Sequence, residues 1–106
     1  MPELPEVETI RRQLEKKIIN KKIKEVIIKD KRLIKEISPR IFKSKTEGAT
    51  FKKILRRGKV LILQIKEKNF VIFHLRISGW VILSKNIEKF SRVIFRLSDD
   101  SNFQFC

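Results

Sequence analysis

The sequence predicts an α+β protein that is mostly β: an N-terminal helix followed by an antiparallel β-sandwich. Two observations carry this prediction. Apolar positions recur at helical spacing in the first twenty residues, whereas short runs rich in β-branched residues follow, separated by turn signals. At 106 residues, with 42% hydrophobic residues, the chain is long enough for one domain with a modest core.

The N-terminal helix is expected from about residue 3 to residue 18. Four apolar side chains recur there at helical spacing between charged ones, namely Val7, Ile10, Leu14 and Ile18. Pro2 and Pro5 fall near the first turn, where proline is tolerated because the first N–H groups have no partner within the helix. The acidic residues at this end also favour the positive pole of the helix dipole.

Extended runs are expected after the helix, over residues 22–30, 32–37, 51–57, 60–66, 70–76, 80–84, 92–98 and 102–106. A short second helix is expected between the second and third runs, with Ser38 as its cap and Pro39 in its first position, ending before Gly48.

Turn signals between the later runs predict an antiparallel meander, which would form a sandwich or a barrel. In the run 92–98, apolar residues alternate with Arg92, Ile94 and Arg96, as expected for a half-buried strand. Because the sequence stops inside the last run, we expect the sandwich to be incomplete at its C-terminus and the chain to be a piece of a longer protein.

The chain has a formal net charge of +14, and the charge is unevenly distributed. Residues 9–66 hold twenty Lys and Arg against five Asp and Glu, whereas the first eight residues hold three acids and no base. A polyanion is therefore the expected partner, and nucleic acid is the commonest one. The alternative is a basic, solvated face with no partner.

No apolar run is long enough for a membrane span, and the charged N-terminus is unlike a secretory signal, so we expect a cytoplasmic protein with no membrane partner. Cys106 is the single cysteine, which excludes an internal disulfide and a cysteine-based zinc site within this chain. We therefore expect no metal and no cofactor here.

Pro2 is a candidate nucleophile. If Met1 is removed, the Pro2 nitrogen becomes a free secondary amine. A free α-amino group has a pKa of roughly 7.7–8.0, and the helix dipole should lower this pKa further. Attack on an aldehyde-like carbon gives a cationic iminium that acts as an electron sink. Glu3 and Glu6 would supply the carboxylic acid that such a step needs. The alternatives are that the stretch only starts a helix, or that Pro2 is a general base, as in tautomerases.

A second cluster is ILRRGKVLIL, residues 54–63, in which three cations flank a glycine between two apolar runs. Arg56, Arg57 and Lys59 would lie on or beside a turn and could contact phosphates. An ordinary charged hairpin turn is the simpler interpretation.

A third cluster is FHLRISGW, residues 73–80. His74, the only histidine, lies in an apolar run, where a satisfied core residue is the commoner case. Ile77, beside Arg76 at a turn, could wedge into a base stack, or it could be buried.

Taken together, the three clusters resemble formamidopyrimidine-DNA glycosylase, a bifunctional base-excision enzyme. The resemblance runs through MPELPEVETIRR, RRGK and HLRISG in the family's order and covers the chain as that family's N-terminal domain. Leu4 favours this branch over the endonuclease-VIII-like enzymes for oxidised pyrimidines, which usually carry glycine there.

The resemblance implies that Pro2 attacks the deoxyribose C1′ and that Glu3 is the acid at the ring oxygen, with Glu6 in support. Lys59 would contact the lesion or its phosphates, and His74 a backbone phosphate. Ile77 stands where the family usually has a wedging methionine; it is apolar but stiffer. The implied reaction removes an oxidised purine and nicks the abasic strand by β,δ-elimination, after base flipping.

The resemblance also implies a partner and a cofactor. We expect a monomer that binds double-stranded DNA containing oxidised bases or abasic sites. The family's helix–two-turn–helix and its zinc finger would follow residue 106, so zinc belongs to that part and not to this chain. Family members often have histidines where this chain has Phe90 and Arg92. The rival interpretation is a DNA-binding remnant without catalytic activity.

Overall fold

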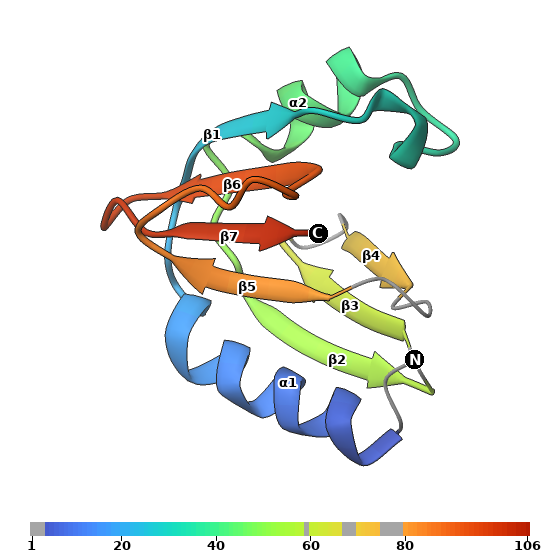
Figure 1. Ribbon diagram of the computed structural model, residues 1–106, viewed down its shortest axis with the longest axis vertical. Coiled ribbons are helices and arrows are strands. Elements are labelled where there is room, and N and C mark those ends of the chain that lie inside the picture. Colours follow the sequence, from blue (N-terminus) through green and yellow to red (C-terminus); the bar gives the residue numbers. More distant parts are fainter. Residues whose placement is uncertain (1–3, 59, 67–69, 75–79) are drawn as a thin grey trace. The chain divides into compact units, whose positions relative to one another are not determined.

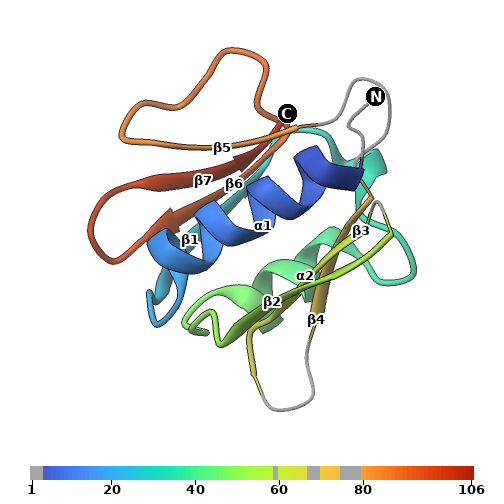
Figure 2. The ribbon, with the colours of Figure 1, turned by 90° about the horizontal axis from the view of Figure 1, so that it is seen from below.

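The computed structural model describes residues 4–58, 60–66, 70–74 and 80–106. The chain forms two compact units, each assembled from two separate stretches of sequence. The first unit comprises residues 1–21 and 50–80, and the second comprises residues 22–49 and 81–106. Figures 1 and 2 show the elements of both units.

The first unit pairs the N-terminal helix with a three-stranded antiparallel sheet. Helix α1 (Leu4–Ile18) matches the expected helix to within one residue. The sheet has the order β2–β3–β4 and consists of β2 (Lys53–Arg57), β3 (Val60–Gln64) and β4 (Phe70–His74). This part of the chain is the predicted meander, and α1 packs on β2 and β3 (Figure 1).

The core of the first unit follows the expected periodicities. Three of the four apolar positions of α1 are buried, namely Val7, Leu14 and Ile18, and the fourth is half-buried. In β3, Leu61 and Leu63 are fully buried and alternate with half-buried residues. The helix therefore buries one stripe and the strand one face, as an amphipathic helix on a sheet requires.

The second unit is a four-stranded antiparallel sheet with a short helix. Its strands are β1 (Ile23–Ile28), β5 (Val81–Ser84), β6 (Val93–Leu97) and β7 (Asn102–Phe105), in the order β1–β6–β7–β5. Helix α2 (Pro39–Thr46) begins as expected, because the Ser38 hydroxyl oxygen accepts a hydrogen bond from the Ile41 N–H at 3.2 Å. Phe42 of α2 lies 6.2 Å from Phe95, ring centre to ring centre.

One expected strand is wrong: residues 32–37 do not form a strand. Asp30 instead caps a 3₁₀ helix, η1 (Lys31–Leu33), by accepting a hydrogen bond from the Arg32 N–H at 3.1 Å. Glu36 then adopts a left-handed conformation, with φ of 70°, which a strand does not contain. The local hydrogen bond at Asp30 thus outweighs the preference of the β-branched residues in this run for a strand.

In the second unit the expected pairing of consecutive strands is confirmed for β6 and β7 but is wrong for β5. Strand β5 pairs with β7 and not with β6, and β6 pairs on its other side with β1. Four of the five residues of the inner strand β6 are buried and only Arg96 is exposed. Phe95 stacks on Phe103 at 5.8 Å, and Ile94, expected on the exposed face, is fully buried opposite Gln104. The described strands form two sheets and no closed barrel.

The predicted fold class, a helix followed by antiparallel sheets, is therefore confirmed. None of the helices within the described ranges is long and apolar enough to cross a membrane.

Candidate functional site

The sequence ranges of the first unit contain all nine predicted site residues. Five of them lie outside the described residues, namely Pro2, Glu3, Lys59, Arg76 and Ile77. For Glu6 in α1 and His74 in β4 the structure describes the backbone only. Arg56 and Arg57, at the end of β2, are described in full.

The hairpin of β2 and β3 holds the second predicted cluster. Arg57 pairs with Val60, which leaves residues 58–59 as the connection. Gly58 has φ of 59°, the left-handed region favoured in two-residue hairpin connections. A Cβ atom at Gly58 would meet nothing within 4 Å, so the backbone conformation and not lack of space favours glycine.

The two neighbouring arginines have different environments. Arg56 donates from Nε to a Glu8 carboxylate oxygen at 3.0 Å and from Nη1 to the Gly58 carbonyl at 3.1 Å. Its side chain is 30% exposed. The side chain of Arg57 is exposed and forms no hydrogen bond or ion pair with another described residue. Of the two side chains, only that of Arg56 is held by other described residues.

Glu8 is the centre of this charged cluster, and sequence reasoning missed it as a functional candidate. Its carboxylate accepts hydrogen bonds from Arg11 at 2.8 and 3.0 Å, from Arg12 at 2.9 Å and from Arg56 at 3.0 Å. The bonds from Arg11 and then Arg56 lower the pKa of Glu8 from 4.5 to about 2. The spacing of Arg11 and Arg12, three and four residues after Glu8 on the helix, could have indicated these ion pairs from the sequence. The sequence gives no such signal for Arg56, which lies 48 positions away.

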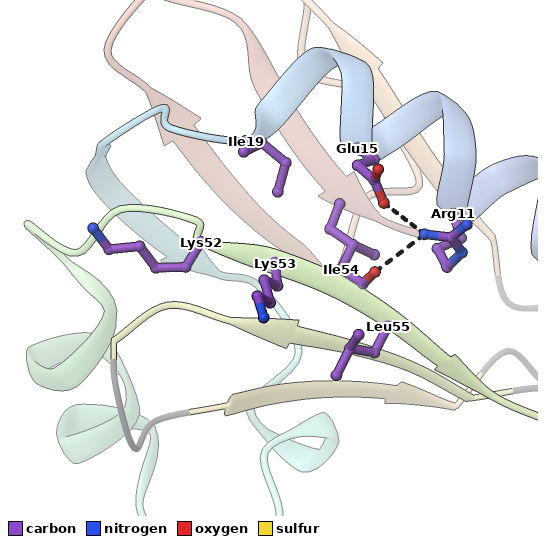
Figure 3. Close-up of a pocket in the computed structure, with 7 residues that line it drawn as sticks. All are labelled: Arg11, Glu15, Ile19, Lys52, Lys53, Ile54 and Leu55. Atoms are coloured by element: carbon purple, nitrogen blue, oxygen red, sulfur yellow. Dashed lines mark hydrogen bonds and ion pairs between the residues drawn. The ribbon is translucent and has the colours of Figure 1, made fainter.

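A hollow of about 330 Å³ lies between α1 and β2 (Figure 3). Arg11 crosses one side of it, because its Nη1 donates both to Glu15 and, at 3.4 Å, to the Ile54 carbonyl. The hydrogen bond to Glu8 is the largest cause that raises the Arg11 pKa above its ordinary value. Arg11 therefore holds helix to strand, and Lys52 and Lys53 are the other cations that line the hollow.

The described residues contain no group of three His, Cys, Asp or Glu side chains placed to hold a metal ion.

The sequence profile described as "Formamidopyrimidine-DNA glycosylase N-terminal domain" matches residues 1–106. The chain belongs to this family, and the resemblance drawn from the three clusters is confirmed.

Curated relatives carry the same family name. The chain is 40% identical to the formamidopyrimidine-DNA glycosylase of Ligilactobacillus salivarius, over 99% of this chain and 39% of the relative. It is 41% identical to that of Lactococcus lactis subsp. lactis, over 94% of this chain and 38% of the relative. The chain thus spans about two fifths of the length of the curated relatives it matches.

Solved structures of formamidopyrimidine-DNA glycosylases bound to DNA have a similar fold over nearly the whole of this chain. A structure of MutM in complex with carbocyclic 8-oxo-G containing DNA matches with a TM-score of 0.92 and 34% identity, covering 99% of this chain and 40% of that one. The wild-type Lactococcus lactis Fpg (MutM) with DNA containing N7-benzyl-Fapy-dG matches with a TM-score of 0.91 and 34% identity, over 99% and 39% of the two chains.

Proposed function

We propose that this chain is the N-terminal catalytic domain of a base-excision DNA glycosylase that removes oxidised purines and nicks the resulting abasic site. The observation that supports the proposal most strongly is membership of the family along all 106 residues. The partner we propose is double-stranded DNA with an oxidised base or an abasic site, bound by a monomer, in keeping with the damaged DNA in the matching complexes.

In this proposal Pro2, freed of Met1, is the nucleophile. Its nitrogen forms a bond to the deoxyribose C1′ and loses its own proton, while the bond from C1′ to the base breaks and the base leaves with that electron pair and takes up a proton. Glu3, supported by Glu6, protonates the ring oxygen as the C1′–O4′ bond opens, which leaves an iminium cation at C1′. Loss of a C2′ proton then expels the 3′ phosphate, and a second elimination expels the 5′ phosphate.

The remaining predicted residues would hold the DNA. Lys59 would contact the lesion or its phosphates, His74 a backbone phosphate, and Arg57 and Arg76 further phosphates. Ile77 would fill the gap left by the flipped base. Two features of the first unit support this assignment. It contains the sequence ranges of all these residues, and β2 ends on an arginine whose side chain has no partner among the described residues.

The proposal is tested by trapping. The Met-free chain, identified by intact mass, is incubated with duplex DNA carrying one abasic site, and borohydride is added to reduce an iminium to a stable amine. We expect a covalent protein–DNA adduct. Glu3→Gln should form it about 100-fold more slowly, since a general acid contributes roughly 10²–10⁴ in rate.

Chain that retains Met1 is the matched control, because its proline nitrogen is tied up in a peptide bond and should form no adduct. DNA binding without any adduct in the Met-free chain would refute the proposed catalysis and leave only a DNA-binding domain. Base excision is then measured on duplexes with a single 8-oxoguanine or a single oxidised pyrimidine. Faster excision of 8-oxoguanine is expected for this branch, and faster excision of the pyrimidine for the endonuclease-VIII-like branch.

A further inference from the structure

We propose that Arg56 is a positioning residue that ties α1 to the connection between β2 and β3, and not a phosphate contact. This inference rests on the proposed function, and it revises the role that the sequence predicts for Arg56. Arg57 and Lys59 are then the cations of the RRGK stretch left to meet DNA.

The hydrogen bonds of Arg56 carry the inference. One guanidinium group joins a carboxylate in α1 to a backbone carbonyl beyond the end of β2, with donor–acceptor distances of 3.0 and 3.1 Å. A planar guanidinium fixes both partners in one geometry, which a lysine ammonium cannot do. Glu8 and Gly58 are thereby held to the same side chain.

The sequence positions of these partners explain what is being positioned. Gly58 directly precedes Lys59, and Glu8 lies on the helix whose N-terminal extension carries Pro2. We call the Arg56 side chain with its bonds to Glu8 and Gly58 the strut. In the sequence, Pro2 and Lys59 are each a few residues from one of its two partners. A displacement of about 1 Å between reacting groups is enough to cost roughly 100-fold in rate.

Charge also argues against a phosphate contact. The positive charge of Arg56 is already offset by Glu8, whose pKa of about 2 keeps it ionised at every working pH. A phosphate that approached Arg56 would also approach this carboxylate. Arg57 has no such neighbour among the described residues, so binding a phosphate there requires no ion pair to be broken.

The first test is the salt dependence of DNA binding. Each phosphate contact contributes about 0.9 to the slope of log affinity against log salt. We expect Arg56→Gln to leave this slope unchanged and Arg57→Gln to lower it by about 0.9. Arg40→Gln, which removes one exposed charge from α2, should match the wild type. A slope reduced by about 0.9 in Arg56→Gln would overturn the inference.

The second test uses borohydride trapping at saturating abasic DNA. Arg56→Lys keeps the charge but cannot bridge Glu8 and Gly58, so we expect its trapping rate to fall at least about tenfold, as in Arg56→Gln, while the half-saturating DNA concentration stays unchanged. Wild-type trapping in Arg56→Lys would overturn the inference, because a phosphate contact tolerates lysine.

A third measurement separates this inference from the proposed function. If the wild type forms no adduct, the catalytic proposal fails. The structural role of Arg56 is then tested by urea unfolding of Glu8→Gln, Arg56→Gln and the double variant. We expect the shift of the double variant to be smaller than the sum of the two single shifts, since both single variants lose the same bond between Glu8 and Arg56. Additive shifts would contradict the strut. If Arg56→Gln does not fold, Arg56→Lys takes its place in the cycle.

Discussion

At the scale of single residues, Glu8 shows how this chain uses its few acids. It accepts hydrogen bonds from three arginines, two on its own helix and one on β2. Its side chain is 26% exposed, so water screens these contacts and their value lies in geometry more than in stability. An acid in the first turns of a helix also suits the helix dipole.

Glu8 leads to a prediction about pH. Its pKa is about 2 in the folded chain and 4.5 in the reference state, so it stabilises the fold fully above pH 4.5 and loses this contribution as the pH falls toward 2. The urea midpoint of the wild type should therefore exceed that of Glu8→Gln at pH 6, and the gap should narrow by pH 2.5. An equal gap at both pH values would contradict the ion-pair cluster.

Gln104 is a second residue whose role is readable only in the structure. It is fully buried, and its side-chain oxygen accepts from the Glu88 N–H at 2.8 Å and from the Ser91 hydroxyl, while its amide donates to the Asn86 carbonyl at 2.9 Å. One side chain of β7 thus satisfies three groups of the segment that leads to β6.

Replacing Gln104 with alanine should destabilise the chain by about 3 kcal/mol, because a buried donor or acceptor left without a partner costs roughly 1–3 kcal/mol. Chemical unfolding measures this loss. Gln13→Ala, an exposed glutamine of α1, is the control and should stay within about 0.5 kcal/mol of the wild type. Equal effects of the two substitutions would contradict the buried network.

At the residue scale, the sequence does not show which partner each charged side chain has. Arg56 and Arg57 are adjacent and chemically identical, and nothing local distinguishes the one that pairs with Glu8 from the one that does not. That distinction depends on α1 lying beside β2, a contact between segments about fifty residues apart.

At the scale of elements, local signals predicted the helices well. The apolar stripe of α1 and the Ser38–Pro39 start of α2 correspond to the observed elements to within one or two residues. Strand partners were predicted only where the strands follow one another closely, as in β2–β3–β4. The pairing of β5 with β7 could not be predicted, since alternating burial gives a strand's face but not its neighbour.

The cap of α2 gives a prediction at this scale. Ser38→Ala should lower the free energy of unfolding by about 1 kcal/mol, because the Ile41 N–H loses its partner. Ser38→Asp should retain the wild-type stability. Ser44→Ala, an exposed serine within α2, is the control, and a loss as large as that of Ser38→Ala would show that the cap is not the cause.

At the scale of the whole molecule, the net charge of +14 is the dominant physical property. If about four phosphates are contacted, raising the salt from about 50 to 200 mM should weaken binding to duplex DNA about a hundredfold. Fluorescence anisotropy measures this directly. An affinity that does not change with salt would show that the basic residues take no part in binding.

The central claim is that the N-terminal proline is the reacting group, and identifying the trapped atom tests it most directly. The borohydride-reduced adduct is digested with protease and nuclease, and the peptide that carries the sugar remnant is sequenced by mass spectrometry. We predict the remnant on the nitrogen of Pro2, in the peptide that begins with this residue. A remnant on a lysine side chain, or no modified peptide in a chain shown to lack Met1, would contradict the account.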